Sequence, residues 1–543
     1  MKKIIAMLLT LCLLLSLAAA EIAETLIVLD GENITVNGAA ITGDSAASVY
    51  LARKVETHED VPAELAGVEN RVITITDGGS YRISGTASDV QIAVCAEDTD
   101  DVRLILDGVN LTCRTSAAIA IYSARDPRVA GEYGVTIELA EGSENLITGS
   151  HNAAMSEEEP EFDGAIGSQV SLGFEGTGKL TVDADNEGVE VAYGHMTING
   201  GVFHIEAGDD PLNVSEDGVG TLTVNDGYLY SAVKNAPGGE GDGIDSNGWI
   251  VFNGGTAINL AHPTSQDGGI DSDMGSTING GVIVGAGNMY DPIESTSGQL
   301  FMMLEFSEQT DDLLVVTDLF GNPVFAYDFP YDYMYIAFST PALQEGETYN
   351  VYLGGEIEGE QQDGLYTSIT SYKPGRQLMH GGGVAEQRNP MMGGMQGFDP
   401  MQGQQPGAAP EMPAGGQGMG GKQPGGMQDF AALAQAYASI DLNELLKEAD
   451  LNELLAGKDL NSLLTGFSLT DLLTEEQLKA IFGENADLTL LERATDMGRG
   501  FGGMGGMAPR GMESSADVAT TRFVLTRENN TFSNVSAVDG NAR

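Results

Sequence analysis

The sequence predicts an all-β protein built around a β-solenoid. Three observations lead to this prediction. Apolar runs of strand length are separated by Gly, Asn and Asp from about residue 70 to 300, one strand-and-turn pattern returns at a nearly constant interval, and 73 of the 543 residues are glycine. A β-sandwich also spaces its strands regularly, but it does not need the same corner residues to recur in register. The solenoid is therefore the favoured fold class.

The composition is strongly acidic and still apolar enough to fold. The chain has 25 Lys and Arg against 80 Asp and Glu, a formal net charge of −55. Nucleic acids and anionic membranes would be repelled, so these partners are excluded. Hydrophobic residues make up 42% of the chain and charged residues 19%, which is too apolar for a disordered acidic chain. Much of the sequence can therefore bury a core.

Residues 1–20 have the pattern of a secretory signal peptide. Lys2 and Lys3 precede an apolar run at 4–17, and three alanines at 18–20 supply the small residues before a cleavage point. The alternative is a membrane anchor, but the run is too short to span a bilayer comfortably, and no other stretch is long and apolar enough. We therefore expect a secreted protein without a membrane span, extracellular or at the cell surface.

An N-terminal segment at 21–70 precedes the repeats, and two cysteines follow it. Export would permit a disulfide between Cys95 and Cys113. Two small buried side chains on neighbouring strands are the alternative. Two cysteines alone do not make a zinc site.

A repeat runs through residues 71–300. The pattern Thr-Ile-Asn-Gly-Gly returns in four versions, with its asparagines 26, 28 and 26 residues apart. These asparagines are Asn199, Asn225, Asn253 and Asn279. A second pattern lies between them and has one apolar centre in each copy. The centres are Ile166, Val189, Leu212, Ile244 and Ile270. Successive coils stack at the spacing of paired strands, so these aliphatic side chains should form an inward ladder, with Asn and Gly at the corners.

Acidic residues accompany each apolar centre. One column precedes the centres by two or three residues and a second follows them by one. They contain Asp163, Glu187, Asp210, Asp242 and Asp267, and then Glu190, Asn213, Asp245 and Asp271. Stacked carboxylates about 5 Å apart repel one another unless they are neutralised. Oxygen ligands without nearby His or Cys point to a hard cation, and Ca²⁺ suits a secreted protein. The candidate ligands are Asp210, Asp242, Asp245, Asp267, Asp271 and Asp273. Alternatively, these side chains fit turns and face solvent.

Basic residues are rare in the repeat, which bears on catalysis. A lyase that cleaves acidic polysaccharides needs a base at the sugar carbon, and between Arg128 and Arg376 only Lys179 and Lys234 are available. Lys234 lies in an inserted loop before Asp242, so it is the better candidate. Both lysines also suit a simple countercharge on an acidic face. We expect no catalytic residue other than Lys234, and Lys234 only if the protein is a lyase.

Three residues are candidate sugar contacts. Trp249 is the only tryptophan, and an exposed indole there would offer a platform for the C–H face of a sugar ring. Its alternative role is to close the core at an irregular coil. Glu190 and Asn213, in the second acidic column, are the other two candidates.

The stretches at 102–111, 135–143, 241–246 and 313–355 carry a family resemblance. Residues 71–377 resemble the clostridial-type carbohydrate-binding domain family, whose fold is similar to that of pectate lyases. The resemblance implies a single-stranded right-handed parallel β-helix, binding of polygalacturonate and other plant-wall chains, bound Ca²⁺ and no firmly assigned catalysis. Asp245 and Asp271 stand where the family often has Lys. Binding of an anionic sugar there therefore requires Ca²⁺ to bridge the carboxylates.

The C-terminal third differs in kind from the repeats. A stretch of Gly, Met, Pro and Gln predicts a linker, because it cannot offset the entropy of ordering. A nine-residue repeat of Asp-Leu-x-x-Leu-Leu type then predicts short capped helices. These helices would form a small bundle or a docking segment for a protein partner. The expected parts are a small β cap at 301–377, a linker at 378–427, a helical segment at 428–492, a Gly/Met linker at 493–513 and a returning strand at 514–543.

Taken together, these features predict a secreted, non-catalytic protein that binds plant-wall polysaccharide with the help of Ca²⁺. The polymer is pectic, with acidic chains favoured, or cellulosic. The alternatives are a polysaccharide lyase acting on uronate polymers and a surface protein whose acidic face only binds Ca²⁺ for structural purposes.

Overall fold

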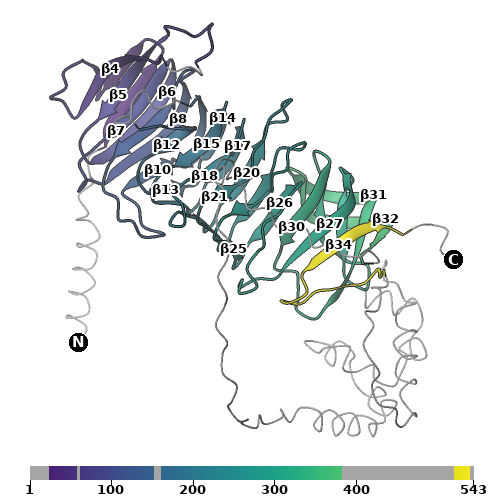
Figure 1. Cartoon of the computed structure of the whole chain (residues 1–543). Helices are drawn as coiled ribbons and strands as arrows, with labels where there is room; N and C mark the ends of the chain where they lie inside the picture. The colour runs from purple at the N-terminus through teal and green to yellow at the C-terminus, as the bar shows by residue number, and fades with distance from the viewer. Residues whose placement is uncertain (1–23, 58–60, 152–159, 382–518, 539–543) are drawn as a thin grey trace, which may run out of the picture. The chain divides into compact units, whose positions relative to one another are not determined.

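The computed structural model describes residues 24–57, 61–151, 160–381 and 519–538 (Figure 1). Over these residues the protein is all-β, as predicted, and contains no helix, hence none with the length and apolarity to cross a membrane. The described strands all belong to one compact unit. The predicted signal peptide, both linkers beyond residue 381 and the helical segment lie outside the described residues.

A nine-stranded sheet runs through the repeats. Its strands pair in parallel from β5 onward, whereas β4 is antiparallel to β5. Figure 1 shows β12, β15, β18 and β21 as successive neighbours. The strands are β4 (Val49–Val55), β5 (Glu69–Ile75), β7 (Val90–Cys95), β9 (Ile119–Ser123), β12 (Gly164–Ser168), β15 (Glu187–Val191), β18 (Leu212–Val214), β21 (Asp245–Ser246) and β24 (Asp271–Ser272).

Two further stacks of parallel strands complete each repeat, and both begin on the long strand β8 (Val102–Thr112). The first contains β10 (Val135–Leu139), β13 (Leu172–Gly176), β16 (His195–Ile198), β19 (Thr221–Val224), β22 (Trp249–Phe252) and β25 (Gly275–Ile278). The second contains β11 (Glu144–Gly149), β14 (Lys179–Ala184), β17 (Val202–Ala207), β20 (Tyr228–Val233), β23 (Thr256–Leu260) and β26 (Val282–Gly287).

The N-terminal strands extend this arrangement. Strand β6 (Gly79–Ser88) pairs in parallel with β8, and β1 (Thr25–Asp30) pairs in parallel with β6. Strands β2 (Asn33–Val36) and β3 (Ala39–Ala40) add antiparallel pairs to β1.

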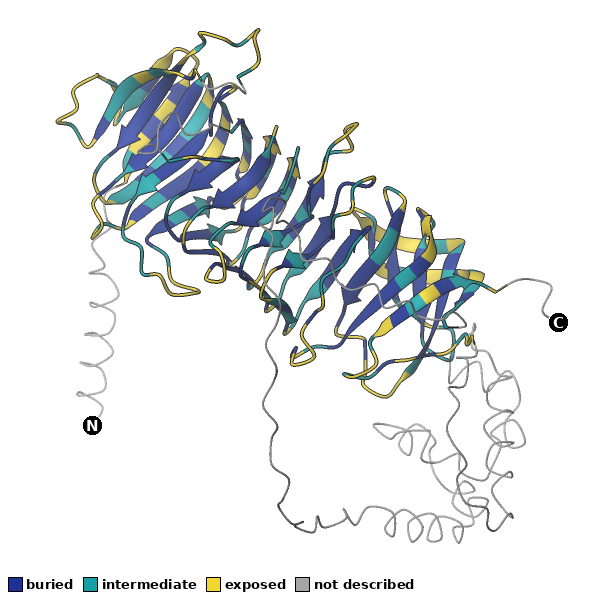
Figure 2. Ribbon diagram, viewed as in Figure 1, coloured by how far each residue is buried: buried dark blue, intermediate teal, exposed yellow. Residues whose placement is uncertain are grey.

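The aliphatic ladder lies in register, as the repeat predicts. Ile166 is opposite Val189, and Val189 is opposite Leu212. These three side chains and Ile244 are fully buried, and Ile270 is 6% exposed. Figure 2 shows that buried residues follow the strands of the repeats, whereas the exposed residues lie in the connecting loops and on strands near the two ends. Each buried aliphatic side chain stabilises the fold by roughly 1.5–3 kcal/mol, so the ladder fixes which residues of successive repeats are neighbours.

The recurring asparagines lie at the corners of the repeats and form a hydrogen-bonded ladder. Asn225 donates to Asn199 (2.7 Å), Asn253 to Asn225 (2.8 Å) and Asn279 to Asn253 (2.9 Å). The last glycine of each pattern has φ between +74° and +107°. A side chain is strained in that left-handed region, so glycine recurs there for a steric reason.

The C-terminal strands differ from a plain solenoid. Strands β28 (Leu314–Thr317), β29 (Pro323–Tyr327), β31 (Thr348–Gln362) and β32 (Leu365–Met379) pair antiparallel in a closed ring, a four-stranded barrel. Next to it, β30 (Tyr333–Ser339) pairs antiparallel with β26 and with β27 (Phe301–Thr310). Strand β33 (Phe523–Val524) pairs with β31, and β34 (Thr531–Ala537) pairs with β27 and β32. The predicted small cap is therefore a barrel joined to sandwich-like sheets, built from long antiparallel hairpins that lack the Asn-Gly-Gly corners.

The two cysteines of the repeat region are unbonded. Cys95 is half-buried and Cys113 is buried, and both thiols are free. The structure therefore favours the two separate thiols over the disulfide.

Candidate metal and carbohydrate site

Three aspartates from two successive repeats meet on the nine-stranded sheet. Asp245 in β21 is the register partner of Asp271 in β24, and Asp242 lies in the turn just before β21. One carboxylate oxygen from each lies within 4.8 Å of the others. The stacking of the repeats creates this cluster, because residues 26 positions apart become neighbours across a single strand spacing. We call these three residues the aspartate cluster.

The turns that carry the first acidic column are tied together by hydrogen bonds. The Gly268 amide donates to Asp242 Oδ1 (2.5 Å), and the Gly241 amide donates to Asp267 Oδ2 (2.7 Å). The Asp242 amide in turn donates to Asp210 Oδ1 (2.7 Å). Asp210, Asp242 and Asp267 therefore follow one edge of the sheet, and each carboxylate accepts a hydrogen bond from an amide of a neighbouring repeat.

Burial and mutual repulsion perturb the aspartate cluster. Burial raises the pKa of Asp242 to about 10, and the neighbouring charges of Asp271 and Asp210 add to the rise. Burial likewise raises the pKa of Asp245 to about 8 and that of Asp271 to about 8. Without a cation these carboxyls hold protons at neutral pH. A divalent cation favours their charged forms, so the donor set fits a hard metal ion that displaces the protons.

The acidic column continues into the preceding repeats. Glu187 is 8% exposed, and its Oε2 is buried without a hydrogen-bond partner, while Oε1 accepts from Asn213 (2.8 Å). Burial and the charge of Glu190 raise the pKa of Glu187 well above its usual range. Burial also raises the pKa of Glu190 to about 7 and that of Asp210 to about 7. The hydrogen bonds within the column therefore do not satisfy all of its buried carboxyl oxygens.

The other predicted metal ligands lie outside the three-residue cluster. Asp210 accepts a hydrogen bond from the Asp242 amide, and Asp267 accepts one from the Gly241 amide. Asp273 is exposed, just after β24. One neighbouring carboxylate was not predicted: Asp291, beyond the last repeat, accepts from the Ser272 amide (3.2 Å). It belongs to no repeat copy, so the sequence pattern gave no signal for it.

The predicted sugar contacts differ in accessibility. Trp249 is 39% exposed, which fits a platform and contradicts the alternative that it closes the core. Glu190 is 3% exposed and Asn213 is 9% exposed. The Glu190 carboxylate accepts from the Asp163 amide (2.9 Å), and Asn213 donates to Glu187. Their burial does not support direct sugar contact, because both side chains are used inside the acidic column.

Lys234, the candidate base of the lyase alternative, is occupied by other groups. Its ammonium donates to Asp183 Oδ1 (2.5 Å) and to the Ala184 carbonyl (2.5 Å). Both contacts hold the ammonium as a countercharge to the acidic face. The geometry therefore favours the countercharge role over proton abstraction.

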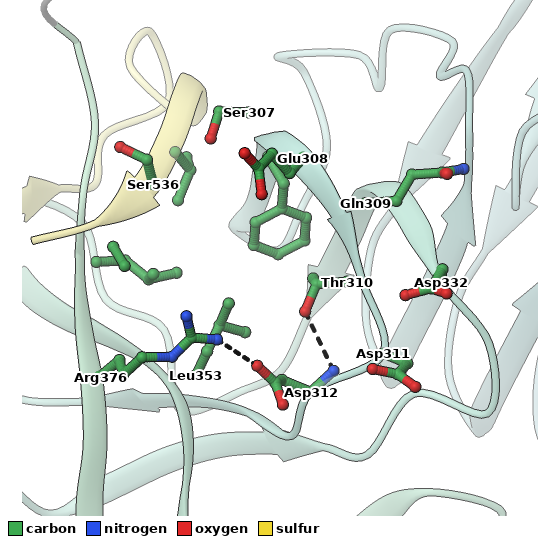
Figure 3. Close-up of a pocket in the computed structure, with 14 residues that line it drawn as sticks. Ser307, Glu308, Gln309, Thr310, Asp311, Asp312, Asp332, Leu353, Arg376 and Ser536 are labelled. Carbon is green, nitrogen blue, oxygen red and sulfur yellow. Dashed lines mark hydrogen bonds and ion pairs between the residues drawn. The ribbon is translucent and has the colours of Figure 1, made fainter.

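A separate polar pocket lies among the C-terminal strands, where β27, β32 and β34 meet (Figure 3). Its volume is about 410 Å³, and its walls carry Glu308, Asp311 and Asp332. Figure 3 shows the guanidinium of Arg376 directed at Asp312, with which it forms an ion pair. The one arginine of the wall is thus neutralised, and the pocket is acidic. It shares no residue with the aspartate cluster.

Part of the chain is similar to proteins described as carbohydrate-binding. Residues 69–298 match the sequence profile of a family described as carbohydrate-binding domain-containing protein. A stretch of 168 residues is 32% identical to a carbohydrate-binding domain-containing protein of Acetivibrio thermocellus. This alignment covers 31% of the present chain and 55% of the relative, so the chain spans about half of that relative's length.

One solved structure is also similar. It is described as the polysaccharide lyase-like protein from C. thermocellum, a gadolinium derivative. The match covers 48% of this chain and 94% of that one, with 23% identity and a TM-score of 0.33.

Proposed function

We propose that this protein, whose residues 69–298 match a carbohydrate-binding domain family, is a secreted, non-catalytic binder of plant-wall polysaccharide. Acidic pectic chains are its preferred ligands, and Ca²⁺ bridges them to the protein. The aspartate cluster on parallel, in-register strands is the observation that carries this proposal. Its finer fold is a right-handed parallel β-helix, in which each repeat is one coil.

Charge explains why a cation is part of the proposal. The chain has a formal net charge of −55, and a uronate polymer is also an anion. The two repel each other unless a divalent ion lies between their carboxylates. Ca²⁺ takes six to eight oxygen ligands in flexible geometry. Three from Asp242, Asp245 and Asp271 leave room for carboxylate and hydroxyl oxygens of a sugar.

The remaining parts of the proposal concern location and partners. The pattern at 1–20 supports export, and the protein then acts outside the cell or at its surface. The leucine repeats at 428–492 support a docking segment for a protein partner.

A retention experiment tests the proposal. The full chain is mixed with insoluble polygalacturonate and with cellulose, in Ca²⁺ and in chelator, and the bound fraction is measured. We expect retention on polygalacturonate in Ca²⁺, with most of it lost in chelator. A bound fraction that is the same in Ca²⁺ and in chelator would contradict the calcium bridge. A failure to bind any of the polymers would contradict carbohydrate binding. Unsaturated product released from the pectin would contradict the non-catalytic assignment.

A further inference from the structure

Exposed apolar side chains gather along one edge of the repeats. The described part of the chain has ten exposed large apolar residues, and five of them lie where the nine-stranded sheet leads into the β10–β25 stack. They are Val129 (50% exposed), Tyr193 (53%), Val219 (48%), Trp249 (39%) and Met274 (44%). We call the last four, which come from four consecutive repeats, the corner row.

Strand register shows that the residues of the corner row follow one another from repeat to repeat. His195, Thr221, Trp249 and Gly275 are successive partners in β16, β19, β22 and β25. Tyr193 and Val219 each precede such a position by two residues, and Met274 precedes its own by one. Neighbouring strands are about 4.8 Å apart, so the row from Tyr193 to Met274 spans roughly 14 Å.

Two side chains of the row, Trp249 and Met274, lie close to residues of neighbouring repeats. A ring carbon of Trp249 lies 3.5 Å from the place where a Cβ of Gly275 would be. The Met274 sulfur lies 4.0 Å from the corresponding position at Gly218, two repeats earlier. These two glycines leave the space that Trp249 and Met274 cover, and the two side chains link the last three repeats of the row. We call the surface of the corner row the apolar strip.

Hydrogen-bonding groups flank the strip. Asn247 donates to Asp217 Oδ1 (3.0 Å) and to the Ser215 carbonyl (3.1 Å), and the Asp217 and Asp273 side chains are exposed. Arg128, the cation beside this edge, is paired with Glu216. The strip therefore combines apolar faces with carboxylate and amide oxygens that accept hydrogen bonds from hydroxyl groups.

We propose that the corner row is a binding surface for an extended 1,4-linked polysaccharide that runs along the stacking direction, with about one sugar residue per repeat. The C–H faces of the sugars pack on Tyr193 and Trp249, and their hydroxyls face Asp217, Asn247 and Asp273. The strand spacing is close to the rise of one residue in such a chain. A protein partner fits this edge poorly, because the strip is narrow and its flanks are acidic, and protein interfaces are depleted of charge at their centre. This inference rests on the proposed function.

Trp249 supplies the test, since it is the only tryptophan of the chain. The full chain is titrated in Ca²⁺ with oligogalacturonates and cello-oligosaccharides of increasing length, and indole emission and acrylamide quenching are recorded. We expect a shift in emission, protection from acrylamide, and affinity that rises up to about four sugar residues, the number of repeats the row crosses. Tyr193→Ala should weaken binding about tenfold, and Met274→Ala should weaken it for the longer oligomers only.

The matched control is Leu26→Ala, which removes an equally exposed side chain (44%) outside the row. It should bind as the wild type does. The corner row is overturned if the polysaccharide is retained but Trp249 emission does not change. It is also overturned if Tyr193→Ala binds the oligomers with the affinity of the wild type. Either result leaves the proposed function intact. If no polymer is retained and no oligomer alters the emission, the proposed function fails and the inference fails with it. Emission needs no substitution, so it is informative even if a variant misfolds.

Discussion

Asp245→Asn should stabilise the calcium-free protein and reduce the stabilisation that Ca²⁺ provides. Asp245 faces Asp242 and Asp271, with carboxylate oxygens within 4.8 Å. Two like charges at that distance repel by about 3 kcal/mol at an effective dielectric constant of about 20. Protonation already removes part of this repulsion at neutral pH, so we expect the substitution to stabilise the calcium-free protein by about 1–2 kcal/mol. In Ca²⁺ the wild type gains about 2.7 kcal/mol at a hundredfold excess over Kd, and the variant gains less because it has lost a charged ligand.

The assay is urea denaturation followed by far-ultraviolet circular dichroism at pH 7.5, in Ca²⁺ and in chelator. Asp98→Asn, an exposed loop aspartate outside the cluster, is the matched control and should follow the wild type in both conditions. The reasoning is refuted if Asp245→Asn is the less stable protein in chelator, or if Ca²⁺ stabilises both proteins equally.

Three further predictions concern pH, the paired lysine and the core. The pKa of Asp242 is about 10 and that of Asp271 about 8, against an ordinary value of 3.8, so the folded chain keeps protons that the unfolded chain loses. The free energy of unfolding of the calcium-free protein should therefore fall from pH 4 to pH 8, and stabilisation by Ca²⁺ should grow over the same range. Thermal melts with and without Ca²⁺ measure this. A difference in Tm between the two conditions that does not change with pH would contradict the linkage. Lys234→Met should leave polygalacturonate retention unchanged, and a retention assay in which it is lost would assign Lys234 to the binding site. Leu212→Ala should cost about 2–5 kcal/mol of unfolding free energy, measured by urea denaturation, because the ladder position is fully buried; a cost below 1 kcal/mol would contradict a packed ladder.

The part of the fold that repeats was open to prediction from sequence. The apolar centres at Ile166, Val189 and Leu212 recur at nearly equal intervals, and a parallel stack is the arrangement that brings such positions together in a buried row. The pairing of Asp245 with Asp271 follows from the same intervals. Periodicity thus gave both the core and the aspartate cluster.

Features without periodicity were missed. The barrel of β28, β29, β31 and β32 has no repeat, and closing it depends on long-range pairing that the local pattern does not specify. Asp291 reaches Ser272 from beyond the last repeat. The burial of Glu190 and Asn213 was missed as well, because it depends on hydrogen bonds to the Asp163 amide and to Glu187, which a repeat pattern does not specify.

A crystal structure of the full chain grown in Ca²⁺ tests the central claim most directly. The account predicts an ion bound by oxygens of Asp242, Asp245 and Asp271 at about 2.3–2.6 Å, with ligands from two successive repeats. An aspartate cluster that stays metal-free at millimolar Ca²⁺, with its carboxyls hydrogen-bonded to one another, would contradict it.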